Sequence, residues 1–206
     1  METQVTMPKS KEEVIGDLKK AAREMQDSYG RRKWGSDSNG FSFKRAAEIY
    51  KELGSTFRNG EIVASREAAT DFLGEEKQYE KSHGPLANYT LIHLEWAINV
   101  LAESNLKREA IPLAEEFIKR FSERAEYNEE GHDFRNAMED MDVAIGVAKR
   151  VGLEDFVKEL ELDRERLENA QKSYQRKEKI KHVLRGIEKH LPLTVNRDFF
   201  KSSTWR

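Results

Sequence analysis

The chain has 206 residues, 37% of them hydrophobic and 36% charged, and it contains no cysteine. A chain of this length and composition can bury one core, which argues against disorder along its whole length. The absence of cysteine excludes disulfide bonds, thiolate zinc sites and thiol catalysis. No apolar run is long enough to span a bilayer, and residues 1–10 lack the apolar stretch of a secretory signal. These features predict a soluble, cytoplasmic (intracellular) protein that does not contact a membrane.

The charge is unevenly distributed, although the net charge is only −2. Residues 172–206 hold ten basic and three acidic side chains, a net charge of +7, whereas the rest of the chain carries −9. A segment of this kind could bind phosphate, as on a nucleic acid, or could lean on the acidic body of its own or a neighbouring chain. We expect one domain at residues 1–170 and an appendage at 171–206, made of a basic helix end and an aromatic tail.

Apolar residues recur every three to four positions along most of the chain, which is the helical period. The period and the end signals predict helices at about 11–28, 42–53, 62–83, 86–104, 107–125, 132–150 and from 153 to the region of Pro192. Ser10 and Glu13 have capping-box spacing, and Ser42 is expected to cap the second helix. The predicted fold is therefore all-α, with about seven antiparallel helices. They would form stacked helical hairpins or an irregular bundle, with a long C-terminal helix whose end is basic.

Residues 29–40 are rich in Gly, Ser, Asp and Asn, which predicts a loop. In this loop Arg31, Arg32 and Lys33 stand next to Trp34. Three cations beside an aromatic ring could hold a nucleic acid or an acidic partner. Alternatively, Trp34 packs on the body while the cations stay in water.

The last helix carries an apolar stripe that lapses between Asn169 and Lys179 and resumes at Ile180. Its cations are candidates for binding a nucleic acid or a protein partner: Lys172, Arg176, Lys177, Lys181, Arg185 and Lys189. The tail that follows contains Phe199, Phe200 and Trp205. Aromatic side chains are costly to leave in water, so the tail either packs on the body or inserts into a groove of a partner.

Small and large residues recur at helical spacing in two segments that are 34 residues apart. Their members are Ala110, Ala114 and Phe117, and then Ala144, Ala148 and Val151. The pattern, over about residues 90–155, resembles the second helix of tetratricopeptide units, whose period is 34 residues. Segments that start at Ala46 and Ala97 read similarly, but the intervals from Ala46 to Ala97 to Ala144 are 51 and 47 residues. The resemblance implies stacked hairpins with a concave surface for a peptide or protein, and it identifies no contacting residue.

Two Glu-x-x-His pairs have the spacing used by di-metal helical bundles: Glu80 with His83, and Glu129 with His132. Both lie beside a glycine at a predicted helix end, where a bundle-core site is not expected. We therefore predict no metal and no other cofactor.

Arg185 and His190 form an Arg-x4-His pattern that is similar to the motif of HEPN-type helical ribonucleases. That resemblance implies that the arginine and histidine polarise a phosphate and assist attack by a 2′-hydroxyl. Gly186 stands where that family commonly has a polar residue.

Taken together, these features favour a non-catalytic protein–protein interaction or adaptor protein that is built from helical hairpins. The alternative is an accessory nucleic-acid-binding protein that uses the basic C-terminal helix and the loop at residues 31–34. A second alternative is a HEPN-like ribonuclease. The identity of the partner and the oligomeric state do not follow from the sequence.

Overall fold

The computed structural model describes residues 9–33 and 40–190, with side chains described except at 30–33 and 188–190. This part of the chain contains seven α-helices and one short 3₁₀ helix, and no strand. The elements are α1 (Lys11–Lys33), α2 (Gly40–Glu52), η1 (Ser55–Phe57), α3 (Arg58–His83), α4 (Asn88–Glu103), α5 (Lys107–Glu130), α6 (Phe134–Val151) and α7 (Glu154–His190). The predicted all-α fold of about seven helices is confirmed. Within these ranges, no helix is both long and apolar enough to cross a membrane.

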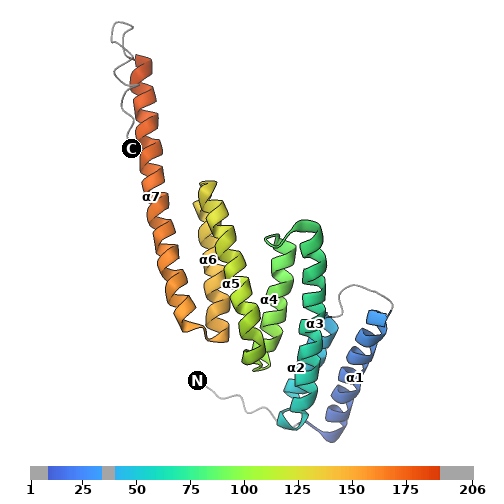
Figure 1. Cartoon of the computed structure of the whole chain (residues 1–206). Coiled ribbons are helices and arrows are strands. Elements are labelled where there is room, and N and C mark those ends of the chain that lie inside the picture. Colours follow the sequence, from blue (N-terminus) through green and yellow to red (C-terminus); the bar gives the residue numbers. More distant parts are fainter. Residues whose placement is uncertain (1–8, 34–39, 191–206) are drawn as a thin grey trace.

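The helices stand in a row that follows their order in the chain, with α1 at one end and α7 at the other (Figure 1). Contacts join each α-helix to the next one from α1 to α7, and α4 also touches α6. Short connections make successive helices antiparallel. The molecule is thus an elongated stack of helical hairpins, with α1–α2, α3–α4 and α5–α6 as successive pairs.

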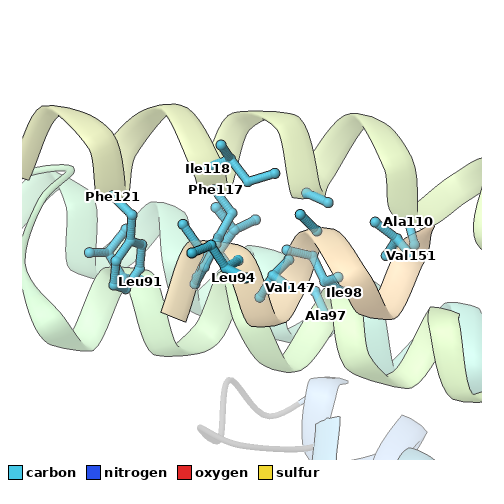
Figure 2. Close-up of a cluster of buried hydrophobic side chains, with 14 of the residues drawn as sticks. Leu91, Leu94, Ala97, Ile98, Ala110, Phe117, Ile118, Phe121, Val147 and Val151 are labelled. Atoms are coloured by element: carbon cyan, nitrogen blue, oxygen red, sulfur yellow. The ribbon is translucent and has the colours of Figure 1, made fainter. Parts of the chain in front are cut away.

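The main hydrophobic core runs along the row from α2 to α7, and Figure 2 shows the part where α4, α5 and α6 converge. Alanines lie fully buried at the helix contacts, among them Ala97, Ala110 and Ala144. Small side chains let neighbouring helix axes approach closely, while larger ones such as Phe117 and Ile98 fill the space between them. The apolar period of the sequence therefore faces the neighbouring helices, as predicted.

Three of the five helix ends that are followed by a residue with positive φ also share a spacing to a buried alanine. Gly54, Asn105 and Gly152 follow α2, α4 and α6 and have positive φ angles of 91°, 56° and 85°. Each lies eight residues after a fully buried alanine: Ala46, Ala97 and Ala144. These alanines are the ones whose intervals of 51 and 47 residues depart from the 34-residue period. They occupy equivalent places on the second helix of each hairpin, whereas the Ala110 segment lies on α5, a first helix. The likeness to tetratricopeptide units stays a prediction.

The predicted loop at residues 29–40 is wrong at both of its ends. Helix α1 continues to Lys33, so Arg31, Arg32 and Lys33 lie in its last turn. The ring of Tyr29 packs edge-on against Phe43 of α2, with 5.1 Å between the ring centroids, and this tertiary contact supports the longer helix.

Helix α2 begins earlier than its predicted cap. It starts at Gly40, so Ser42 lies inside it, only 7% exposed, and not at its N-cap. A Cβ atom added at Gly40 would lie 2.5 Å from the ring of Phe72, so the glycine allows the chain to pass close to α3. The start of this helix is therefore set by Gly40, which packs closely against α3, and not by a capping side chain at Ser42.

Candidate interaction surface on the last helix

Helix α7 consists of two segments with different surroundings. We call residues 154–174 the proximal segment and residues 175–187 the distal segment. In the proximal segment, Val157, Leu160 and Leu167 are buried and belong to the main core. The apolar residues of the distal segment are all exposed.

Ion pairs fasten the proximal segment to the body. Arg166 donates to Glu129 of α5 at 2.8 Å, and Arg164 pairs with Asp142 of α6. The hydrogen bond to Glu129 raises the pKa of Arg166, and the one to Asp142 raises the pKa of Arg164. These contacts fix the direction in which α7 leaves the body.

The described ring contacts of α7 with the body end at Tyr174. Its ring lies 4.6 Å from that of His132 and 5.7 Å from that of Phe134, measured between centroids. His132 has a positive φ of 63° in the turn between α5 and α6. The turn therefore supports α7 at the point where the helix passes the end of the body.

The outer face of the proximal segment is a charged cap. Asn105 before α5 and Gly152 before α7 are 47 residues apart, and both have positive φ, so the two helices can be aligned at these residues. The buried positions of α5 are Ala110, Ala114, Phe117, Ile118, Phe121 and Ala125. Their counterparts in α7 are Val157, Glu161, Arg164, Glu165, Glu168 and Lys172. Of these counterparts only Val157 is buried; Glu161 and Arg164 pair with charged residues of α6, and the others offer no apolar face for a further helix.

The distal segment projects beyond the body because α7 is much longer than the helix on which it packs. Helix α6 has 18 residues and α7 has 37. At 1.5 Å per residue, α7 is about 28 Å longer. Figure 1 shows its C-terminal part extending past the other helices. The distal segment therefore does not lie along the acidic body of its own chain.

An apolar stripe follows one side of the distal segment. Ile180, Val183, Leu184 and Ile187 are 60%, 59%, 44% and 48% exposed. Their spacing of three and four residues places them on one face of the helix. Apolar side chains are more stable when buried than in water, and the described residues leave this face about half exposed.

Cations border this stripe. The distal segment holds five Lys or Arg residues and one Glu, a net charge of +4, whereas the proximal segment carries −3. Lys181 donates to Glu178 at 2.6 Å, and this bond lowers the pKa of the Glu178 carboxyl. Among the described side chains, Lys177 and Lys179 form no ion pair. The surface combines an apolar face with unneutralised positive charge.

The structure brings most of the predicted cations of the last helix onto this projecting part. Arg176, Lys177, Lys181 and Arg185 lie in the distal segment and are exposed, whereas Lys172 is exposed in the proximal segment and pairs with Glu168. Lys189 and His190 are in α7, but their side chains lie outside those described, as do the side chains of Arg31, Arg32 and Lys33. Trp34, Phe199, Phe200 and Trp205 lie outside the described residues altogether. The pairing of Arg185 with His190 accordingly stays a prediction.

The two Glu-x-x-His pairs make other contacts. Glu80 lies 3.7 Å from Arg120, and the Nδ1 atom of His83 is 2.7 Å from the hydroxyl of Ser82. Glu129 accepts from Arg166, and His132 packs against Tyr174. Within the described ranges, no group of three or more His, Asp or Glu residues is placed to hold a metal ion.

Buried polar pairs inside the stack were not predicted. The Nε2 atom of His93 lies 2.8 Å from Glu75, and Arg124 pairs with Asp140. His93 and Asp140 are each four residues before the alanine that recurs in α4 and α6, and Ser42 holds this place in α2. All three are buried. This recurrence of a polar residue four positions before the alanine is the sequence signal that would have identified them.

Comparison with known proteins identifies no relative. No family model, no curated protein and no solved structure matches this chain. The inference of function therefore depends on the surface of the molecule itself.

Proposed function

We propose that this chain is a non-catalytic protein–protein interaction protein, in which a stack of helical hairpins holds the distal segment of α7 out toward a partner protein. The observation that carries the proposal is the apolar stripe of Ile180, Val183, Leu184 and Ile187, which projects from the body with its side chains about half exposed. Exposed apolar faces of this kind are typical of surfaces that dock other molecules.

The polar end of the stack supports the same proposal. The outer face of the proximal segment is largely charged, so the α7 end of the row has no apolar face on which further helices would stack. The apolar side chains of α7 that remain exposed are concentrated instead beyond the body. Leu162, at 68% exposed, is the exception in the proximal segment.

Nucleic-acid binding is the second candidate function. Lys177, Lys181 and Arg185 are exposed and follow one another at four-residue spacing, so they form a line of cations along α7. Such a line can neutralise backbone phosphates. It leaves the apolar stripe unused, and for that reason we rank this function second.

Photo-crosslinking in cells of the natural host tests the first function. A photoreactive amino acid replaces either Leu184, on the stripe, or His182, on the opposite side of the same turn. We expect a discrete protein adduct from position 184 that resists nuclease and is absent from position 182. No protein adduct, or equal adducts from both positions, would refute the proposal.

A salt titration tests the second function. Purified chain is mixed with generic RNA and DNA at low ionic strength, and salt is then added. If the chain binds nucleic acid, the logarithm of the binding constant should fall steeply and linearly with the logarithm of the salt concentration. The slope should be smaller in the triple variant Lys177→Gln/Lys181→Gln/Arg185→Gln, which makes fewer phosphate contacts. Absence of binding at low salt eliminates this function.

A further inference from the structure

We infer that the partner segment which occupies the apolar stripe is an amphipathic helix with acidic residues on both sides of its own apolar seam. The inference rests on the proposed function and specifies the chemistry of the partner. It follows from the spacing of the stripe, from the charges that border it and from the charges that a second copy of this chain would bring.

The spacing of the stripe matches the seam of a two-helix coiled coil. Ile180 and Ile187 are seven residues apart, and Val183 lies between them. With Ile180 at position a of a heptad, Val183 occupies d and Ile187 the next a. Apolar side chains at a and d pack into holes formed by a facing helix, so a second helix is the natural cover for this face.

The positions that flank the seam select the charge of the partner. Lys177 and Lys179 fall at positions e and g of this heptad frame, where interhelical salt bridges set the choice of partner. Both are cations, and neither is paired with another described side chain. A partner helix with Glu or Asp at its e and g positions would neutralise both sides at once.

A second copy of this chain brings the wrong charge. The distal segment has a net charge of +4, so two copies that met through their stripes would place like charges along both flanks. The acidic part of α7 is the proximal segment, whose apolar residues Val157, Leu160 and Leu167 are buried in the body. The proximal segment therefore offers no acidic apolar face that matches the stripe of a second copy.

The shape of the stripe also favours a helix over an anionic membrane surface. Its four exposed side chains are aliphatic, and three are β-branched, whereas helices that lie in a membrane interface usually carry Trp, Phe or Leu on a broad apolar face. The stripe is narrow, with Lys177 next to it on one side and Lys179 on the other. One packed helix is enough to cover it.

Two designed helical peptides with the same Ile/Leu seam provide the probe. One carries Glu at every e and g position, and the other carries Lys there. Binding to the full chain is measured by fluorescence anisotropy at low and physiological salt. We expect the acidic peptide to bind at least tenfold more tightly than the basic one, with a preference that weakens as salt is added. Equal binding of both peptides, or preference for the basic one, would overturn the inference.

Three variants localise the effect, and circular dichroism verifies that each one folds. Ile180→Asn/Ile187→Asn should lower the affinity for the acidic peptide at least tenfold, because it removes the seam. Lys177→Glu/Lys179→Glu should reverse the preference toward the basic peptide. Lys181→Glu/Arg185→Glu makes the same change in net charge away from the seam, so it should retain the preference for the acidic peptide. If this control reverses the preference as fully, net charge and not the seam selects the peptide, and the inference is wrong.

Other occupants give distinguishable results, each of which contradicts the inference. If the chain alone sediments as a dimer, and Ile180→Asn/Ile187→Asn sediments as a monomer, the occupant of the stripe is a second copy of the chain. Binding to anionic phosphatidylserine vesicles that is lost in the same variant would identify a membrane. If the acidic peptide fails but position 184 still crosslinks to a protein, only the chemistry of the partner is overturned. If both experiments fail, the proposed function falls as well.

Discussion

The proximal and distal segments of α7 belong to one uninterrupted helix, yet different interactions hold them in place. Leu167 in the proximal segment has no exposed surface, whereas Leu184 in the distal segment is 44% exposed. The proximal segment is joined to α5 and α6 by core contacts and ion pairs. Among the described residues, the distal segment is held mainly by contacts within the helix, such as the one between Lys181 and Glu178, and its link to the body is the Coulombic interaction of Glu178 with His132.

This difference shows how a stacked helical protein can end and still offer a binding surface. The charged outer face of the proximal segment closes the stack, and the distal segment carries the exposed apolar side chains away from it. Substitutions in the proximal segment should therefore change the stability of the fold. Substitutions in the distal segment should change binding and leave the stability nearly unaltered.

The largest expected effect comes from a pair of leucine truncations. Leu167→Ala should lower the free energy of unfolding by about 2–5 kcal/mol, because it removes a fully buried side chain and leaves a cavity. Leu184→Ala should change it by less than about 0.5 kcal/mol, since its side chain lies at the surface. Urea unfolding followed by circular dichroism measures both. A loss of similar size in the two variants would mean that the distal segment packs on the body.

Alanine substitution of the two glycines near the ends of α7 should change stability in opposite directions. Gly152 has φ of +85°, so Gly152→Ala places a side chain in the left-handed region and should cost about 1–2 kcal/mol of unfolding free energy. Gly186 lies inside the helix, and a Cβ added there meets nothing within 4 Å. Gly186→Ala should therefore stabilise the distal segment locally, by about 0.5–1 kcal/mol.

Urea unfolding reports the change at Gly152, and hydrogen exchange reports the change at Gly186. Amides of the distal segment should exchange about two to five times more slowly in Gly186→Ala, with no change in the proximal segment. Slower exchange in both segments would show that α7 opens as a single unit, which contradicts the division made here.

Helical periodicity was enough to predict the fold class and most of the helix bounds. Leu91, Leu94 and Ile98 repeat along one face of α4, and all three are buried. The start of α2 escaped prediction because Gly40 sits there for its contact with Phe72, a residue 32 positions away. The close approach of two helices leaves no local signal in a sequence.

The candidate surface was predicted only in part. The return of apolar residues at Ile180, Leu184 and Ile187 is visible in the sequence, and so is the surrounding positive charge. Val183 is not among these predicted positions, although it lies on the same face between Ile180 and Ile187. Whether the basic end leans on the acidic body or projects from it depends on the lengths of α6 and α7, and on contacts such as that of Tyr174 with His132. The number of charged residues in the sequence gives neither the relative lengths of the two helices nor their tertiary contacts.

A smaller difference in unfolding free energy is expected when one cation is neutralised in each segment. Arg166→Gln removes the ion pair between Arg166, which is 51% exposed, and Glu129, which is 25% exposed. It should lower the free energy of unfolding by about 0.2–1 kcal/mol. Lys179→Gln should leave the unfolding free energy unchanged, since Lys179 has no described partner outside the helix. Urea midpoints at low and high salt measure both, and added salt should reduce the effect of Arg166→Gln. An equal loss from Lys179→Gln would place a tertiary contact in the distal segment.

The smallest effect concerns the titration of Glu178. The hydrogen bond from Lys181 holds its pKa below the ordinary value of a glutamate. A group whose pKa is lowered by folding stabilises the folded state above its unfolded pKa, and this contribution is lost as the pH falls through the folded pKa. The hydrogen-bonding partner of Glu178 is on the same helix, and His132 of the body contributes less, so the loss should mainly reduce the local helicity of the distal segment.

Titration of Glu178 by NMR, in the wild type and in Lys181→Gln, tests this expectation. The pKa of Glu178 should rise toward the ordinary value in the variant, while hydrogen exchange in the proximal segment stays the same at each pH. If protonation of Glu178 also speeds exchange around Leu167, the two segments are energetically coupled. A partner bound to the distal segment would then also stabilise the stack to which α7 is attached.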